Sequence, residues 1–201
     1  MQMLTLAECL PPRPPAAVAL GTFDGVHLGH RALLAETLRA AREKGLLASA
    51  FTFDAPPAAL FGGKRCEVLT DIREKAALMG ECGIDTVIHT AFDADIAAQS
   101  AGDFFQRLLL DRLNARHIVI GFHYHFGCRA AGDAALMERF CREAGIGLTV
   151  VPPVRLPDGA LISSSAIRAS LAANDRPRAE EMLNRPLSAR EEALLGGRYN
   201  E

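Results

Sequence analysis

The sequence predicts an α/β protein built on a doubly wound parallel sheet of five strands, with a small helical extension at the C-terminal end. Between residues 16 and 151, five short apolar runs alternate with longer stretches whose apolar residues recur at helical spacing. The composition is that of an ordinary soluble domain, since 49% of the residues are hydrophobic and 23% are charged. A chain of 201 residues can bury one core of this kind and has no room for a second domain of similar size.

Each predicted strand is a short apolar run, and each predicted helix carries its apolar residues on one face. The strands are expected at 16–20, 46–53, 85–89, 116–120 and 148–151. The helices between them are expected at 28–44, 71–82, 101–113 and 131–144. Gly45, Gly83 and Gly145 follow three of these helices, as glycine commonly does. Strands joined through helices run parallel, and right-handed crossovers place helices on both faces of the sheet.

The alternation stops after the last predicted strand. Pro152 and Pro153 interrupt it, and residues 157–159 read Pro-Asp-Gly, which is a turn sequence. Two short helices are expected afterwards, at 163–173 with a serine cap and at 177–183. We therefore expect one domain over residues 1–186, followed by a polar tail over residues 187–201 that forms a helix with a frayed end.

Charge and cysteine content exclude several classes of protein. The chain has 22 basic and 24 acidic residues, so it lacks the basic excess that is typical of nucleic-acid-binding proteins. No apolar run reaches the roughly 18 residues of a membrane span, and the first residues do not resemble a signal peptide. The five cysteines are scattered without a CxxC pair. We expect a cytoplasmic protein that acts on small molecules, without a nucleic-acid or membrane partner.

The strongest motif lies where the first strand meets the first helix, and residues 21–30 read GTFDGVHLGH. Glycines allow backbone N–H groups to approach an anion, and a helix N-terminus favours negative charge. His27 and His30 are three residues apart and therefore share one face of the first helical turn. Gly29 lets a nucleotide lie close to the backbone. This pattern predicts a triphosphate site, and it is neither a Walker loop nor a GxGxxG motif.

A second motif lies at the start of the helix predicted at 163–173. Ser163, Ser164 and Ser165 can cap backbone N–H groups or bind a phosphate there. Arg168 follows one turn later and can reach the same anion with two parallel hydrogen bonds. Alone, this segment reads as an ordinary serine cap with a surface arginine; beside the histidine motif, a phosphate site is the preferred interpretation.

These motifs resemble those of one family. The segment GTFDGVHLGH resembles the signature of the FMN adenylyltransferase module of prokaryotic bifunctional FAD synthetases, in the nucleotidyltransferase superfamily. The resemblance extends from about residue 18 to residue 186. Further resembling segments are TFDAPP at 52–57, LT through Lys75 to CGID at 69–85, IVIGFHYHFG with Gly-Asp at 118–133, and ISSSAIR at 162–168. The resemblance implies a Rossmann-like sheet of the nucleotidyltransferase type.

The resemblance implies transfer of the adenylyl group of ATP to FMN, with Mg²⁺, to give FAD and pyrophosphate. The attack would be in line and would need no covalent intermediate and no metal ligand from the protein. The expected catalytic residues are His27, His30 and Arg168. The expected nucleotide-binding residues are Gly21, Thr22, Phe23, Asp24, Gly25, Gly29, Ser163, Ser164 and Ser165. The expected flavin-binding residues are Pro57, Phe61, Phe105, His123 and Phe126.

The chain departs from the family pattern on the acceptor side. Pro56 occupies the place of the histidine in the family's TFxPHP loop, and His123 replaces an aspartate or asparagine. Two alternatives follow: a nucleotidyltransferase for another phosphorylated acceptor, and a nucleotide- or flavin-binding protein with little turnover. His123, His125 and Cys128 have a spacing that could bind a metal, although a polar loop is the favoured interpretation. The three candidate phenylalanines could equally be core residues.

The last fifteen residues resemble no kinase motif of the bifunctional family. The riboflavin kinase module of those enzymes contains a PTAN segment, and residues 187–201 contain nothing similar. We therefore expect the chain, as it stands, to lack riboflavin kinase activity.

Overall fold

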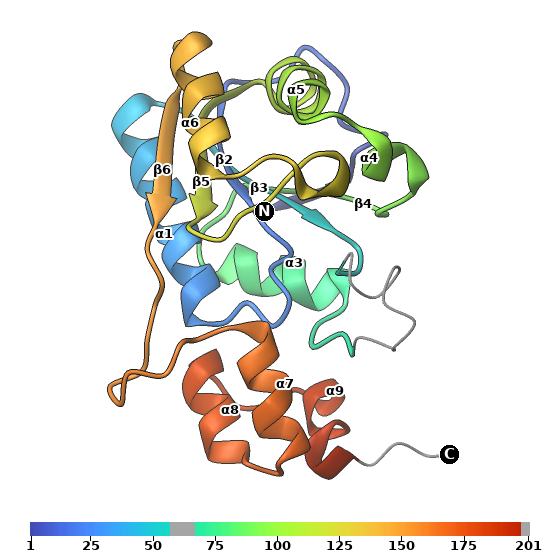
Figure 1. Ribbon diagram of the computed structural model, residues 1–201, viewed down its shortest axis with the longest axis vertical. Helices are drawn as coiled ribbons and strands as arrows, with labels where there is room; N and C mark the ends of the chain where they lie inside the picture. The colour runs from blue at the N-terminus through green and yellow to red at the C-terminus, as the bar shows by residue number, and fades with distance from the viewer. Residues whose placement is uncertain (57–66, 198–201) are drawn as a thin grey trace.

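The computed structural model describes residues 1–56 and 67–197, and its centre is a parallel sheet (Figure 1). The sheet has six strands in the order β1-β4-β3-β2-β5-β6, and all the pairs are parallel. The strands are β1 (Gln2–Thr5), β2 (Ala16–Leu20), β3 (Leu47–Phe53), β4 (Thr86–Thr90), β5 (Ala115–Gly121) and β6 (Gly147–Val151). The doubly wound α/β class predicted from the sequence is confirmed.

The predicted number of strands was wrong, because β1 adds a sixth. Among the described residues this strand lies at the edge of the sheet and pairs with β4 alone, from Gln2 opposite Thr86 to Thr5 opposite His89. Its residues are exposed or half-buried. An edge strand of four residues therefore lacks the apolar pattern that reveals a central strand.

The two faces of the sheet bury different helices, and alternate residues of one strand show this. The helices are α1 (Leu28–Lys44), α3 (Ile72–Glu81), α4 (Ala94–Ala98), α5 (Ala101–Asp103), the π-helix η1 (Phe104–Arg112), the 3₁₀ turn η2 (Cys128–Ala130) and α6 (Ala134–Glu143). In β2, Val18 and Leu20 pack with the buried residues of η1 and α6, whereas Ala17 and Ala19 pack with those of α1 and α3. Period-two alternation thus fills two cores from one apolar strand.

The helix ends follow local capping chemistry. Helix α1 ends at Gly45 in the left-handed conformation, as predicted. Asp71 caps α3 in a complete capping box with Glu74. Helix α6 begins three residues later than predicted, because η2 precedes it and Asp133 accepts a hydrogen bond from the N–H of Leu136.

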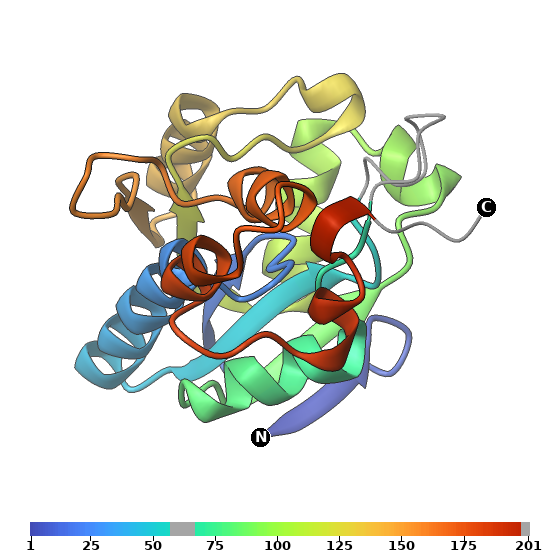
Figure 2. The ribbon, with the colours of Figure 1, turned by 90° about the horizontal axis from the view of Figure 1, so that it is seen from below.

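The C-terminal helices form a separate layer beneath the sheet, at the end towards which β6 points (Figure 1). They are α7 (Ser164–Ala172), α8 (Arg176–Leu183), α9 (Ala189–Glu192) and the 3₁₀ turn η3 (Leu195–Gly197). Seen from below, they lie across the carboxyl ends of the strands (Figure 2). Their core contains Ile167, Leu171 and Leu183, and it also includes Leu69 from the segment before α3.

No helix within residues 1–56 and 67–197 has both the length and the apolar character needed to cross a membrane.

Candidate active site

The site lies where the strand order of the sheet reverses. From β2 the chain continues to β3 and β4 on one side, and later to β5 and β6 on the other. Ligands of doubly wound sheets bind beyond the carboxyl ends of the strands at this point. A cavity of about 840 Å³ lies there. It is lined by residues that follow β2 and β5, including His27 and His30 on one side and Phe126 on the other.

The two histidines lie against each other at the start of α1. Their rings stack with centroids 3.7 Å apart and planes 16° apart. His27 is the N-cap residue of α1, and its Nδ1 accepts a hydrogen bond from the backbone N–H of His30 at 3.3 Å. An added Cβ at Gly29 would meet the His27 ring at 3.1 Å, which explains the glycine between them. Because Nδ1 is an acceptor, the neutral His27 ring carries its proton on Nε2 and can donate it.

Burial keeps both imidazoles neutral. Burial is the main cause that lowers the pKa of His27 to about 4, and the nearby Arg168 charge lowers it further. Burial also lowers the pKa of His30 well below its ordinary value, assisted by the charges of His27 and Lys75. Nδ1 of His30 is buried and has no hydrogen-bond partner among the described residues. A buried polar atom without a partner is costly in a folded protein, and a bound ligand would satisfy it.

We expect the free energy of unfolding to decrease in acid because of His27. In the unfolded chain this group titrates near 6.5, whereas its pKa in the folded chain is about 4. Below pH 6.5 the unfolded state therefore binds more protons than the folded state. As the pH falls to 4, the contribution of His27 to the free energy of unfolding decreases by about 1.4 kcal/mol per pH unit. The full loss is roughly 3 kcal/mol, and this group contributes no further change above pH 6.5.

Urea unfolding of the wild type and of His27→Asn, followed across this pH range, measures the effect. Asparagine is a good N-cap residue and does not titrate, so this variant keeps the start of α1. The acid loss should be smaller in the variant. Equal losses in both proteins would contradict the assignment of the slope to His27.

Asp24 joins three segments of the chain from a buried position. Its side chain is 1% exposed and accepts hydrogen bonds from the N–H groups of Leu69 at 2.9 Å and Thr70 at 3.1 Å. It also forms an ion pair with Arg168 of α7. Burial raises the pKa of Asp24, while its N–H donors and Arg168 act in the opposite direction. Its contacts place Asp24 behind the surface of the site, where it holds the strand-to-helix loop and Arg168 together.

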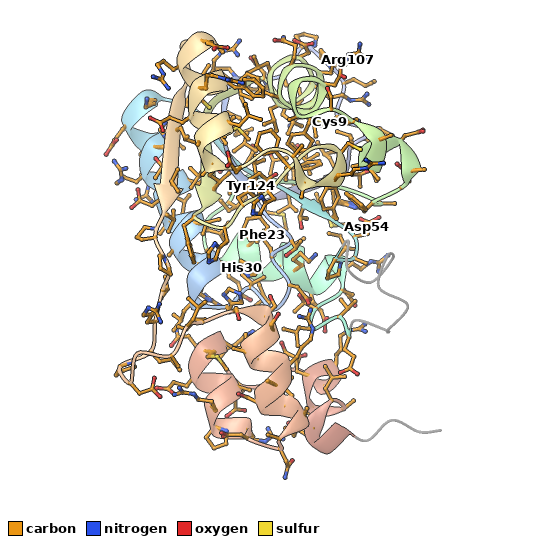
Figure 3. All side chains as sticks on the ribbon, viewed as in Figure 1. Cys9, Phe23, His30, Asp54, Arg107 and Tyr124 are labelled. Atoms are coloured by element: carbon orange, nitrogen blue, oxygen red, sulfur yellow. The ribbon has the colours of Figure 1, made fainter. Side chains whose placement is uncertain are left out.

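The predicted nucleotide-binding residues after β2 divide into two groups. Gly21, Thr22 and Gly29 line the cavity. Phe23 is fully buried with a positive φ of 49°, and its ring centroid lies 5.2 Å from that of His30. Gly25 donates its N–H to Oγ1 of Thr70 at 2.9 Å. Phe23 and Gly25 therefore shape the loop from behind, as Asp24 does. Figure 3 shows Phe23 and His30 in the middle of the molecule, near the C-terminal helices.

The three serines occupy the start of α7 in different ways. Ser163 is the N-cap residue, and its Oγ accepts from the N–H of Ala166 at 3.1 Å. Oγ of Ser164 donates to the backbone oxygen of Asp24 at 2.9 Å, and Ser165 is exposed. The structure does not place the serines in the cavity lining, to which this segment contributes Leu161 and Ile162.

Arg168 is held from two sides. It donates from Nη2 to Asp24 and from Nε to the backbone oxygen of Glu67 at 2.6 Å. It does not line the main cavity. Its side chain is 20% exposed, so the sequence prediction of a phosphate contact stays a prediction.

Several aromatic side chains line the cavity. His123 and Phe126, which were expected to bind a flavin, are among the lining residues, and the ring centroids of His123 and Phe122 lie 3.7 Å apart. Phe105 instead lies in the core against Phe140, and its neighbour Phe104 lines the cavity. Phe104 and Phe105 are neighbours on η1, so a difference of one position along the helix decides which ring lines the cavity and which lies in the core. Pro57 and Phe61 lie outside the described residues.

The sequence did not single out several lining residues. These are Phe51, Phe53, Phe92, Phe104, Phe122 and Tyr124. Tyr124 lines the cavity, and burial raises its pKa, so its hydroxyl stays neutral. Two of them could have been found from the rule that ligands lie beyond the ends of the strands. Phe53 is the last residue of β3, and Phe122 directly follows β5.

Lys75 is a buried charge close to the site. Its side chain is fully buried, and Nζ donates to the backbone oxygen of Phe53 at 2.9 Å. Burial lowers the pKa of Lys75 to about 8, with Asp24, Asp54 and Asp71 acting in the opposite direction. The ammonium group therefore supports the end of β3, where the segment TFDAPP begins.

The proposed metal ligands His123, His125 and Cys128 do not form a metal centre. Within residues 1–56 and 67–197, no group of three or more histidine, cysteine or acidic side chains is placed to hold an ion. All three residues line the cavity separately.

Comparisons with known proteins match the part of the chain that contains these residues. A model of the FAD synthetase family matches residues 11–166. A "Bifunctional riboflavin kinase/FMN adenylyltransferase" from Pseudomonas fluorescens is 33% identical over 197 residues, which are 98% of this chain and 63% of that protein. The protein of the same name from Escherichia coli (strain K12) is 33% identical over 178 residues, which are 88% and 56% of the two chains. The chain thus spans less than two thirds of the length of these relatives.

Solved structures resemble the fold. A crystal structure described as a macrolide-efflux protein from Streptococcus pneumoniae has a TM-score of 0.82 and 26% identity, covering 93% of this chain and 63% of that one. Pantothenate synthetase from Thermus thermophilus has a TM-score of 0.53 and 19% identity, covering 92% and 82%. The second likeness concerns the fold alone.

Proposed function

The chain belongs to the FAD synthetase family, and from this membership we propose that it transfers the adenylyl group of ATP to the phosphate of FMN. The products are FAD and pyrophosphate. An oxygen of the FMN phosphate forms a bond to the α-phosphorus of ATP, while the bond from that phosphorus to the bridging oxygen of pyrophosphate breaks. Such a transfer depends on positioning and on charge stabilisation more than on covalent catalysis.

One observation carries the proposal: a single cavity contains both the stacked histidines and a set of aromatic side chains. His27 and His30 line this cavity, and so do Phe104, Tyr124 and Phe126. Neutral imidazoles at a helix N-terminus suit a triphosphate, and aromatic rings suit a flat ring system such as a flavin. The two reactants would therefore meet inside one site of about 840 Å³.

The residues of the chain would act by binding and orienting. His27 would donate from Nε2 to a phosphate oxygen, and the unpartnered Nδ1 of His30 would gain a partner in the bound state. The N-terminus of α1 would favour the negative charge that develops on the leaving pyrophosphate. Arg168, together with Ser164 and Ser165, would contact the β- and γ-phosphates from the side of α7. No side chain needs to act as a nucleophile.

Mg²⁺ fits this site as a companion of the substrate. The described residues that line the cavity include no carboxylate, and Asp24 is occupied by Arg168 and two N–H groups. Mg²⁺ commonly keeps several waters and binds substrate phosphates. When bound, it would neutralise phosphate charge.

We expect the purified chain to form FAD from FMN and ATP with Mg²⁺, with one pyrophosphate released per FAD. Chromatography of the flavins and a coupled pyrophosphate assay measure both products. Riboflavin is the matched control acceptor, because it has the same ring and lacks the phosphate that attacks.

Two other outcomes would replace the proposal. Pyrophosphate release only with a different phosphorylated acceptor would assign another nucleotidyltransferase activity. The exposed His123 at the cavity, together with Pro56 in place of the family histidine, is the observation that favours this second candidate. ATP binding without turnover of any acceptor would indicate a binding protein.

A further inference from the structure

We propose that Arg185 and Glu191 are positioning residues for the ATP site. The pair would hold the 21–27 loop, which joins β2 to α1, in the shape that binds the triphosphate. This inference rests on the proposed function, and it concerns residues that the sequence assigned to a polar tail or to its boundary.

The contacts between these two residues are short and bidentate. Nη1 of Arg185 donates to Oε2 of Glu191 at 2.7 Å, and Nη2 donates to Oε1 at 2.7 Å. The Glu191 side chain is 0% exposed and that of Arg185 is 15% exposed. Bidentate pairs of this kind fix both groups in one orientation. Burial of two charges is costly, so such a pair is weak evidence for stability alone.

Glu191 also organises the chain that carries it. In α9 its carboxylate accepts from the N–H of Ser188 at 2.9 Å, and Oγ of Ser188 accepts from the N–H of Glu191 at 3.3 Å. This is a capping box at the start of a four-residue helix. The position of the carboxylate is therefore set by α9, and not by Arg185 alone.

Arg185 connects the pair to the nucleotide loop. Its Nη2 donates to the backbone oxygen of Gly25 at 3.3 Å. Gly25 has a φ of +83°, and its N–H donates to Thr70. Two residues further along, His27 begins α1. Arg185 thus reaches the loop from the C-terminal helices, and Thr70 holds the same residue through its N–H group.

Packing tightens the same connection. A Cβ placed on Gly25 would lie 3.0 Å from Leu69 and 3.3 Å from Leu183, which is in the last turn of α8. The loop therefore has little free space on the side of α8. A shift of the α8–α9 connection would therefore move Gly25, and with it His27 two residues further along. The His27 ring also has little free space, because a Cβ added at Gly29 would meet it at 3.1 Å.

Glu191→Gln tests this role. Glutamine keeps the size of the side chain but replaces one carboxylate oxygen by a donor that cannot accept from Arg185. We expect the Kd for ATP, measured by calorimetry, and the KM for ATP to increase by roughly tenfold, because small displacements of site residues are costly. The KM for FMN should change by less than about twofold, since the aromatic side of the cavity does not contact this pair.

Glu192→Gln is the matched control. Glu192 is on the same helix and pairs with Arg176 at 2.8 Å, but both side chains are more than two-fifths exposed and neither contacts the loop. Exposed pairs contribute little, so ATP affinity should stay within about twofold of the wild type. Arg185→Lys is the second variant. It keeps the charge and loses the bidentate geometry, so it should also weaken ATP binding selectively.

The outcomes separate the possible roles. Unchanged ATP affinity in both Glu191→Gln and Arg185→Lys, measured on folded protein, would overturn the proposal, even if both proteins melted at a lower temperature. Equal losses for ATP and FMN would also overturn it, because they would indicate a general structural role. If the wild type binds ATP but makes no FAD, the proposed function fails, and the same comparison of ATP affinities still decides the positioning role. A wild type that does not bind ATP would overturn both.

Discussion

Replacing His27 with alanine is expected to lower the rate of the proposed FAD formation by about two to three orders of magnitude, the usual cost of removing one preorganised donor to a developing charge. His27 lines the cavity, is 5% exposed, and has its Nδ1 fixed by the N–H of His30. The remaining Nε2–H is therefore aimed by the start of α1. Steady-state kinetics with ATP and FMN measure kcat, and calorimetry measures ATP binding separately.

His117→Gln is the control for the loss of a buried imidazole. His117 is also buried, but it lies on β5 and does not line the cavity. Its Nε2 forms a hydrogen bond with Oγ1 of Thr149 at 2.8 Å. Its removal should leave kcat close to that of the wild type. A similar kcat for His27→Ala and the wild type would exclude His27 from catalysis, whatever the change in stability.

Asp24→Ala will reduce the free energy of unfolding by about 3 to 5 kcal/mol, the usual range when one partner of a buried ion pair is removed. The change leaves Arg168 without its carboxylate and leaves the N–H groups of Leu69 and Thr70 without an acceptor. It also removes the ion pair between the 21–27 loop and α7, while the hydrogen bond from Ser164 to the backbone oxygen of residue 24 can still form. Urea unfolding measures the loss of stability.

Asp71→Ala is the control, because Asp71 is a half-exposed carboxylate that also accepts from two backbone N–H groups and pairs with Arg190 at the surface. Removal of a helix cap costs about 1 kcal/mol, so the two losses should differ clearly. Asp24→Asn should lie between them, since its side-chain oxygen still accepts from the backbone while the ion pair is lost. Equal losses for Asp24→Ala and Asp71→Ala would show that the ion pair with Arg168 contributes nothing.

The architecture could be predicted from the sequence because the patterns that indicate its strands and helices are local. The apolar run at 16–20 and the helical spacing in 28–44 each depend on neighbouring residues only, and the structure confirms both elements. The same holds for the histidine motif, whose spacing and adjoining glycine bring His27 and His30 together whatever the rest of the chain does. Edge strand β1 was missed because its pairing with β4 lies more than eighty residues away.

Helix register and local capping limited the prediction of the acceptor side. The sequence selected Phe105, but the orientation of η1 buries it against Phe140 and turns Phe104 toward the cavity. The serines illustrate the same limit. Their pattern predicted a helix start correctly, yet Ser163 and Ser164 satisfy backbone groups of the protein itself. Whether a hydroxyl faces a ligand or a neighbouring loop depends on the loop, which the motif does not contain.

The sequence by itself thus determined the parallel α/β class, the family resemblance and the proximity of His27 and His30, because each depends on short-range periodicity or on a contiguous motif. Only the tertiary structure decided that Asp24 binds Arg168 and that Arg185 reaches Gly25, across 144 and 160 residues of sequence. It also decided which aromatic rings enclose the cavity. Buried polar contacts of this kind form only after separate elements have packed, since packing both removes the water and brings the partners within reach.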